Sequence, residues 1–234
     1  MMFNSALLFV SGWNISANIF KPFVKSLAVE EKVFLGFMTP PLLEIGENGY
    51  DVAGSLLLKE VAKLKKIARN VYLVGWSMGG QVILSMANQL DVAGVVFLNS
   101  AAIFSRDQRS KRLFATQCAT DFERAVGYFH KLMGKLSIED SIVLKQNFIN
   151  NKESALGYLK ELHLRDLTDS CKALNIPVQI IHTVGDKIIS VNEAEYLHNS
   201  IKESSLTILP LDSHFPFFDN RDKILDLLRN FMQV

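Results

Sequence analysis

The segment Gly75-Trp76-Ser77-Met78-Gly79-Gly80 restricts the fold of this 234-residue chain more than any other feature. It lies between an apolar run, 71–75, which predicts a buried strand, and the helical pattern 79–89. Gly-x-Ser-x-Gly at such a junction is typical of a sharp strand-to-helix turn that raises a serine hydroxyl above a sheet. Glycines are needed on both sides because larger side chains would collide across the turn. We therefore predict that Ser77 is a nucleophile.

Apolar runs alternate with helical patterns over most of the chain. This alternation predicts an α/β fold with a mostly parallel sheet flanked by crossover helices. The predicted strands are 6–10, 32–37, 71–75, 94–98, 177–182 and 206–209. The predicted helices are 51–69, 79–89, 192–201 and 221–232.

Residues 101–172 interrupt the alternation. They contain no convincing strand but several amphipathic helical patterns, such as the spacing of Phe122, Val126 and Phe129. A stretch of this length is too long for an ordinary loop. We expect an α/β core formed by residues 1–100 and 173–234, with a helical lid or cap formed by 101–172.

Charge and cysteine content exclude several classes of protein. Lys and Arg total 25 against 24 Asp and Glu, so no global basic field exists to bind nucleic acid. Cys118 and Cys171 are far apart and do not form a Cys-x-x-Cys pair, which argues against a disulfide scaffold or a zinc site. The short apolar start lacks a basic flank, and no run of about 18 apolar residues occurs. We expect a cytoplasmic monomer that does not bind membranes.

A serine nucleophile needs a base and an orienting acid, which in this fold follow in the order Ser, Asp or Glu, His. His214 follows the last predicted strand, in the loop Leu211-Asp212-Ser213-His214-Phe215. Loops at the carboxyl ends of parallel strands lie on one edge of the sheet, together with Ser77. Of the other histidines, His182 lies within an apolar strand and is expected to be a core residue. His214 is therefore the predicted base.

Asp186 is the predicted acid, because it follows strand 177–182 and precedes His214. Asn99, at the end of strand 94–98, cannot carry the charge. Asp212 is the alternative, but its position two residues before His214 suggests that it shapes the loop instead. For the oxyanion we expect the backbone amides of Met78, directly after the nucleophile, and Trp13, in the loop after the first strand. This chemistry needs no metal or cofactor.

The chain resembles the α/β-hydrolase superfamily and, within it, the pimeloyl-[acyl-carrier protein] methyl ester esterases of biotin synthesis. Gly12-Trp13 and the segment 75–80 match motifs of that family, and 186–189 and 213–217 are similar to its acid and base segments. Ser11 replaces the usual histidine of the oxyanion loop. The first core strand begins close to residue 1, so we expect a reduced N-terminal hairpin. The resemblance implies an esterase that removes a methyl cap from a carrier-bound pimeloyl chain.

The start of the predicted lid is rich in basic residues. Arg106, Arg109, Lys111 and Arg112 lie close together, and Arg124 follows. Such a patch suits an acidic carrier protein or phosphopantetheine, and the resemblance implies that arginines on the lid hold that carrier. A solvated helix face is the alternative. Phe122, Phe129 and other aromatic residues of the insertion are expected either to line a tunnel for an acyl chain or to form the core of the cap.

Together these features predict a serine carboxylesterase that acts through an acyl-enzyme, with methyl pimeloyl-acyl carrier protein as the favoured substrate. One alternative is a hydrolase of small esters, thioesters or carbon–carbon bonds with the same three residues. The other is a ligand-binding protein without catalysis. Retention of Ser77, Asp186 and His214 argues against the second alternative, because a binder needs none of them.

Overall fold

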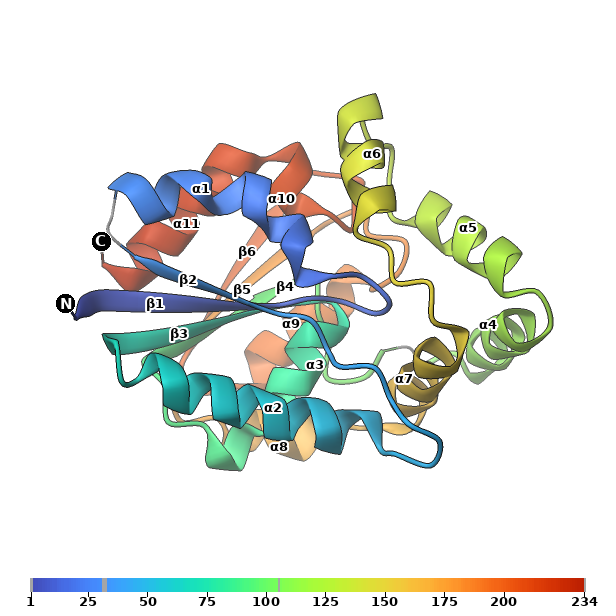
Figure 1. Cartoon of the computed structure of the whole chain (residues 1–234), viewed down its shortest axis with the longest axis horizontal. Helices are drawn as coiled ribbons and strands as arrows, with labels where there is room; N and C mark the ends of the chain where they lie inside the picture. The colour runs from blue at the N-terminus through green and yellow to red at the C-terminus, as the bar shows by residue number, and fades with distance from the viewer. Residues whose placement is uncertain (1, 31–32, 105, 234) are drawn as a thin grey trace.

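The computed structural model describes residues 2–30, 33–104 and 106–233. Its centre is a six-stranded sheet in the order β2-β1-β3-β4-β5-β6 (Figure 1). All neighbouring strands of this described sheet run parallel. The strands are β1 (Phe3–Val10), β2 (Phe34–Met38), β3 (Ala68–Trp76), β4 (Gly94–Leu98), β5 (Val178–Thr183) and β6 (Ser204–Leu209). The expected α/β architecture is confirmed.

Helices cover both faces of the sheet, which explains why the central strands are apolar throughout rather than alternating. One face carries α1 (Lys21–Glu30), α10 (Pro216–Asp219) and α11 (Arg221–Met232) (Figure 1). The other carries α2 (Gly49–Leu64), α3 (Met78–Ser85), α8 (Thr168–Ala173) and α9 (Val191–Ser200). Short 3-10 helices occur at Ala17–Phe20 and Ala87–Gln89. No helix among the described residues is long and apolar enough to cross a membrane.

The strand order changes direction between β1 and β3. From β1 the chain moves outward to β2, then returns to β3 on the other side of β1 and continues towards β6. Val10 and Gly75 are paired across β1 and β3, so the loops that follow the two strands start side by side. Crevices at such a reversal are where open α/β sheets bind ligands.

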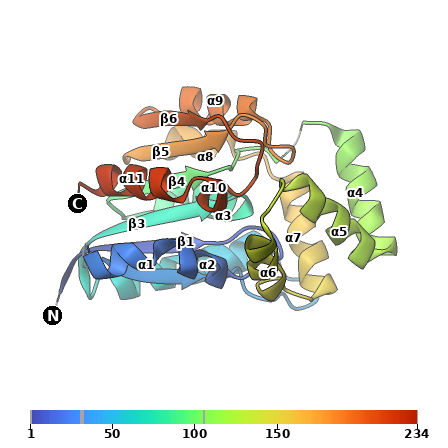
Figure 2. The same cartoon turned by 90° about the horizontal axis from the view of Figure 1, so that it is seen from above.

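The insertion after β4 lies beyond the carboxyl ends of the strands (Figures 1 and 2). It contains α4 (Gln108–Thr120), α5 (Phe122–Leu132), α6 (Ile138–Gln146) and α7 (Lys152–Leu164). The next helix, α8, contacts α3 and α9 on the core instead. The helices that cover the strand ends are therefore α4 to α7, and we call these four helices the cap.

Most element boundaries differ from the sequence expectation by a few residues, and two helices differ by more. The helix expected over 51–69 ends at Leu64, because Ala68 already pairs with Phe3 in the sheet. The helix expected over 79–89 is interrupted at Met86, whose φ of −102° and ψ of 11° leave the α-helical region before a separate 3-10 turn. Lys32, the expected start of the second strand, lies outside the described residues. Gly94–Leu98 and Arg221–Met232 have the expected bounds.

Candidate active site

Ser77 occupies a sharp turn between β3 and α3. Its φ of 54° and ψ of −124° are unusual for a residue with a side chain. The turn is packed so tightly that added methyl groups would clash: one at Gly79 would lie 2.2 Å from the carbonyl oxygen of Val10, and one at Gly75 would lie 2.5 Å from the Cα of Gly80. The glycines flanking Ser77 are thus required by backbone contacts, as expected for this motif.

Neighbouring backbone and hydroxyl groups hold the strained residue. The amide of Ser77 donates to the carbonyl of Leu98 at 3.0 Å, and the Ser100 hydroxyl donates to the Ser77 carbonyl at 2.8 Å. Both partners come from the end of β4, next to β3 in the sheet. Such support is what allows a strained conformation to persist at a site.

His214 and Asp186 form a buried pair on the loops after β6 and β5. Nδ1 of His214 donates a hydrogen bond of 2.6 Å to Oδ2 of Asp186, and both side chains are fully buried. Nε2 of His214 is buried and has no hydrogen-bond partner among the described residues. The ring of Trp76, the residue before Ser77, lies 5.5 Å from the imidazole between ring centres. The pair therefore lies beside the Ser77 turn.

The carboxylate of Asp186 is well supplied with donors. Oδ1 accepts hydrogen bonds from the backbone amides of Ile188 and Ile189 at 2.8 and 3.1 Å. Burial alone would raise the pKa of Asp186. The positive charge available on His214 and the hydrogen bonds from His214 and Asn99 outweigh burial and hold the pKa below its ordinary value. Asp186 is thus an ionised carboxylate at neutral pH.

Asp212 and His182, the residues weighed against Asp186 and His214, make different contacts. Asp212 lies against Gly185, and within the described chain no hydrogen bond joins its carboxylate to His214. His182 is fully buried and donates from Nε2 to the carbonyl of Ile189 at 3.0 Å, as expected for a core histidine. Burial, the main cause, lowers the pKa of His182.

Sequence reasoning missed Asn99 and Thr183. Asn99 was set aside because it cannot carry a charge, yet its Nδ2 donates to Oδ2 of Asp186 at 2.7 Å and to the Thr183 hydroxyl at 2.8 Å. Thr183 in turn donates to the carbonyl of Ser213, next to His214. The available signal was a polar residue at the carboxyl end of a buried strand, the same signal that singled out Asp186.

The two amides expected to face an oxyanion are free in different ways. Met78 is the first residue of α3, so its amide has no acceptor one turn earlier. Trp13 follows Gly12, where an added methyl group would lie 3.1 Å from the Cβ of Ser77. No hydrogen bond from the Trp13 amide occurs within the described residues. Gly12, Asn14 and Met78 are among the residues that line a space of only about 10 Å³.

The Trp13 side chain connects this loop to the cap. Its indole Nε1 donates to the carbonyl of Ala155 in α7 at 2.8 Å. Its ring packs edge-on against Phe114 and Phe129, with centroids 5.8 and 5.2 Å away. Trp13 is thus a buried aromatic residue whose side chain contacts the cap, while its backbone amide belongs to the loop beside Ser77.

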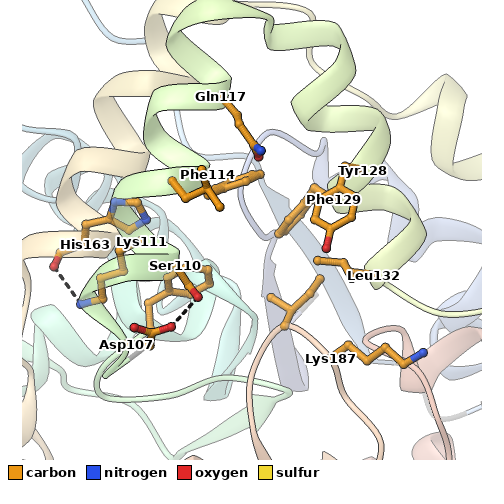
Figure 3. Close-up of a pocket in the computed structure, with 13 residues that line it drawn as sticks. Asp107, Ser110, Lys111, Phe114, Gln117, Tyr128, Phe129, Leu132, His163 and Lys187 are labelled. Atoms are coloured by element: carbon orange, nitrogen blue, oxygen red, sulfur yellow. Dashed lines mark hydrogen bonds between the residues drawn. The ribbon is translucent and has the colours of Figure 1, made fainter.

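A cavity of about 350 Å³ lies between α4, α5 and the loop after Asp186 (Figure 3). Phe114, Phe129 and Leu132 give it an apolar wall, while Gln117 and Tyr128 add polar groups (Figure 3). Its size is within the range of small-ligand pockets. Ser77 and His214 are not among its lining residues, but Trp13 bridges from the Ser77 loop to its aromatic wall.

The basic residues of the insertion divide into two groups. Arg106 donates from Nε to Glu193 at 2.9 Å and stacks on Tyr196, so it joins the insertion to α9. Lys111 is 6% exposed and donates to the carbonyl of His163 at 3.0 Å, near the end of α7 (Figure 3). Lys111 is therefore buried rather than part of an exposed basic patch, whereas Arg106 pairs with Glu193 but stays on the surface, with its side chain 53% exposed.

The other three basic residues expected to hold a carrier, Arg109, Arg112 and Arg124, are exposed on α4 and α5. Of the two phenylalanines singled out in the insertion, Phe129 lines the cavity, whereas Phe122 is 8% exposed and packs in the core of the cap. Packing in the cap core is therefore observed for Phe122, whereas a tunnel for an acyl chain stays a prediction for Phe129. Among the described residues, no group of three or more His, Cys, Asp or Glu side chains is placed to hold a metal ion.

Comparison with known proteins agrees with the fold. No family model matches the chain. It is 25% identical over 250 residues to a pimeloyl-[acyl-carrier protein] methyl ester esterase of Aeromonas hydrophila, covering 97% of this chain and 94% of the relative. It is also 25% identical over 241 residues to the protein of that name from Vibrio cholerae, covering 96% and 93%. An esterase from Exiguobacterium antarcticum superposes with a TM-score of 0.86 at 19% identity, covering 100% and 94%. The chain has the α/β-hydrolase fold.

Proposed function

We propose that this chain is a serine carboxylesterase and that Ser77, His214 and Asp186 are its nucleophile, base and acid. The observation that carries the proposal is the buried 2.6 Å hydrogen bond between His214 and Asp186 beside the strained Ser77 turn. It leaves Nε2 of His214 as the ring nitrogen that can accept a proton. A buried acid–base pair of this kind has a use beside a nucleophile but none in a protein that only binds ligands.

The reaction follows from these roles. The Ser77 hydroxyl attacks the ester carbonyl carbon as its proton passes to Nε2 of His214. Asp186 orients the ring and stabilises the imidazolium. The amides of Trp13 and Met78 donate to the oxyanion of the tetrahedral intermediate. Collapse of that intermediate breaks the carbon–oxygen bond, and the leaving alcohol takes the proton from His214. Water then attacks the acyl-enzyme by the same route, which releases the carboxylic acid and restores Ser77.

The substrate we propose is the methyl ester of pimeloyl-acyl carrier protein, in biotin synthesis in the cytoplasm. Relatives from two organisms that carry this name match nearly the whole chain. The cavity under the cap has an apolar wall suited to an acyl chain. Exposed Arg109, Arg112 and Arg124 form a basic surface on α4 and α5 where an acidic carrier can dock. We propose a monomer, with no bound cofactor in the reaction.

A short-chain ester is the second candidate substrate. The space beside Gly12 and Met78 is only about 10 Å³, which is room for about one water molecule and favours no large alcohol group. A methyl ester carries the smallest alcohol group whatever its acyl chain, and a small free ester is comparable. The two candidates therefore differ in the acyl side, for which we propose the cavity between α4 and α5.

The nucleophile is tested with a fluorophosphonate probe. We expect the wild-type chain to be labelled and Ser77→Ala not to be labelled. Ser85→Ala, which removes another hydroxyl from α3, is the matched control and should be labelled normally. Substrate class is tested by incubating the enzyme with methyl pimeloyl-carrier protein and following loss of the methyl group by mass spectrometry. Turnover of short p-nitrophenyl esters without demethylation of the carrier substrate would favour the second candidate.

A further inference from the structure

We propose that Asn99 is a positioning residue for the acid: its side-chain amide holds the carboxylate of Asp186 in the orientation that receives His214. This inference rests on the proposed function, because it concerns the same acid–base pair. Nδ2 of Asn99 lies 2.7 Å from Oδ2 of Asp186, the oxygen that also accepts the hydrogen bond from His214. All three side chains are buried.

The backbone of Asn99 is arranged for this contact. Asn99 directly follows β4, and its amide donates to the carbonyl of Ile181 in β5 at 3.0 Å. Its φ of 41° is in the left-handed region, which asparagine tolerates better than other residues with a side chain. Strain of this kind persists where surrounding structure enforces it and is concentrated at functional sites. Here the enforced geometry carries an amide from the end of one strand to the acid that follows the next.

The hydrogen bonds of the carboxylate explain why this amide matters. Oδ1 of Asp186 is held by two backbone amides in its own loop. Oδ2 receives only side-chain donors, His214 and Asn99, among the described residues. His182 comes within 3.9 Å of Oδ2 but spends its Nε2 hydrogen on a backbone carbonyl. Asn99 is therefore the one fixed donor that keeps Oδ2 from turning when His214 moves or changes charge.

Asn99 also links the acid to the loop of the base. Besides Asp186, its Nδ2 contacts the Thr183 hydroxyl at 2.8 Å and the carbonyl of Ser213 at 3.3 Å. Thr183 donates to the same Ser213 carbonyl. The ends of β4 and β5 and the residue before His214 thus meet at one amide group, which sets the distance between the acid and the base.

The expected consequence is a change in both rate and pH dependence. An amide donor withdraws negative charge from the carboxylate, so its loss leaves more charge facing His214. More charge stabilises the protonated imidazole, and His214 must be neutral to act as base. The acid limb of the rate profile should therefore move to higher pH when the donor is removed. The other titratable groups near the pair are His182 on β5, Asp212 beside Gly185, and Asp219, which bonds to Ser213.

Two variants test this. Asn99→Gly keeps the left-handed backbone and removes the donor. Asn99→Asp keeps the shape and replaces the donor by a like charge. With a soluble p-nitrophenyl ester we expect kcat to fall about tenfold in Asn99→Gly and further in Asn99→Asp, with KM within about twofold. The acid limb should rise by roughly half a pH unit in the first and about one unit in the second. The low-field NMR signal of the His214 Nδ1 proton should shift or broaden in both.

Asn48→Ala is the control for lost stability, because the Asn48 side chain caps α2 by accepting from the amides of Tyr50 and Asp51 and takes no part in the hydrogen bonds of Asp186. It should retain the wild-type kcat and acid limb. The inference is overturned if Asn99→Gly and Asn99→Asp keep the wild-type acid limb and NMR signal, even when they are less stable. If the wild-type chain is not labelled by a fluorophosphonate and hydrolyses no ester, the proposed function fails and this inference fails with it. If the wild type is active but the limb does not move, only the role of Asn99 is rejected.

Discussion

The indole of Trp76 donates a 2.8 Å hydrogen bond to the backbone carbonyl of His214, 138 residues further along the chain. Trp76 is fully buried and directly precedes Ser77, and its ring packs against Phe215 and Phe217 with centroids 4.8 and 5.4 Å away. One side chain therefore joins the turn of the proposed nucleophile to the loop of the proposed base. We expect the distance between these two loops to depend on this contact.

Trp76→Phe should separate the two contributions of the indole. Phenylalanine keeps most of the apolar contact but leaves the His214 carbonyl without a donor, which costs about 1 to 3 kcal/mol of unfolding free energy. Because the base loop is then less fixed, we expect kcat for a soluble ester to fall roughly tenfold with little change in KM. Urea unfolding and steady-state kinetics measure both. A less stable enzyme with wild-type kcat would show that the bond is structural only.

Gly79→Ala should destabilise the chain strongly. The added methyl group would lie 2.2 Å from the carbonyl oxygen of Val10 and 2.7 Å from that of Ser11, and backbone atoms cannot move aside as a side chain can. We expect a loss of about 3 kcal/mol or more, at the upper end of the range for overpacked sites. The measurement is the urea midpoint of the purified protein, or its soluble yield if it fails to fold.

Gly127→Ala is the matched substitution on α5. Nothing lies within 4 Å of the added methyl group, so only the helix preference of alanine applies. It should stabilise the chain by up to about 1 kcal/mol. Equal loss of stability at Gly79 and Gly127 would contradict the claim that close backbone approach, not glycine flexibility, selects the residue after Met78.

Much of the fold could be predicted because buried parallel strands are continuous apolar runs. Gly94–Leu98 is buried at every residue and was found with its bounds. The Gly-x-Ser-x-Gly motif, the order Ser, Asp, His and the positions just after predicted strands then locate Ser77, Asp186 and His214. The boundary at Leu64 could not be predicted in this way, because it depends on the pairing of Ala68 with Phe3 in another strand.

Contacts between distant residues account for the rest. Arg106 bonds to a residue 87 positions away and Lys111 to one 52 positions away, so neither partner is visible in the local pattern of charge. The local sequence therefore groups Arg106 and Lys111 with Arg109 and Arg112, although only the last two are exposed without a structural partner elsewhere in the described residues. The contact of Asn99 with Asp186 could not be predicted for a related reason. A neutral amide gives no charge pattern in the sequence, and the carboxylate that it contacts is brought beside it only by the fold.

Asp186→Asn and Asp212→Asn compare the two candidates for the catalytic acid, which lie in the loops after β5 and β6. Only Asp186 accepts from His214, so its amide variant should misorient the imidazole and lower kcat by about 10³- to 10⁴-fold. Asp212→Asn should change kcat by only a few-fold. Both are measured with a p-nitrophenyl ester near neutral pH. The reverse order of effects would transfer the role of acid to Asp212.

Stability should fall as the pH is lowered from about 6.5 to about 4. Burial, together with nearby Lys111, lowers the pKa of His163 from 6.5 to about 4. The unfolded chain therefore binds more protons than the folded chain across this interval, so the free energy of unfolding rises with pH there. The stabilising contribution of His163 is fully present above pH 6.5. With allowance for its partial exposure, His163 should account for about 1 to 2 kcal/mol.

His163→Phe should reduce this dependence, because the aromatic contact with Phe104, 5.9 Å between ring centres, is kept while the titration is removed. Urea unfolding of both proteins at pH 7 and pH 5 gives the comparison. The variant should lose less stability between the two values than the wild type. Its remaining slope is expected from His130 and His182, whose pKa values burial also lowers. An unchanged slope would exclude His163 as a contributor.

Arg109→Glu combined with Arg112→Glu tests whether the exposed face of α4 binds an acidic carrier. Both side chains are exposed, whereas Arg106 is paired with Glu193 and Lys111 is bonded to the carbonyl of His163, so reversing either charge would also disturb a structural contact. We expect KM for methyl pimeloyl-carrier protein to rise at least tenfold, most strongly at low salt, where attraction between charged surfaces is least screened. A soluble methyl ester should be hydrolysed within about twofold of the wild-type rate.

Lys202→Glu combined with Lys223→Glu is the control for net charge. It replaces two exposed lysines away from α4 and alters the total charge by the same amount, two Lys-to-Glu changes against two Arg-to-Glu changes. If docking is local to α4, this control keeps the wild-type KM for the carrier substrate. Equal loss in both double variants would mean that overall charge steers the carrier. Equal loss of activity on the carrier substrate and on soluble esters would mean that the arginines support the structure of the cap. Loss of a docking contact alone would slow only the reaction that needs the carrier.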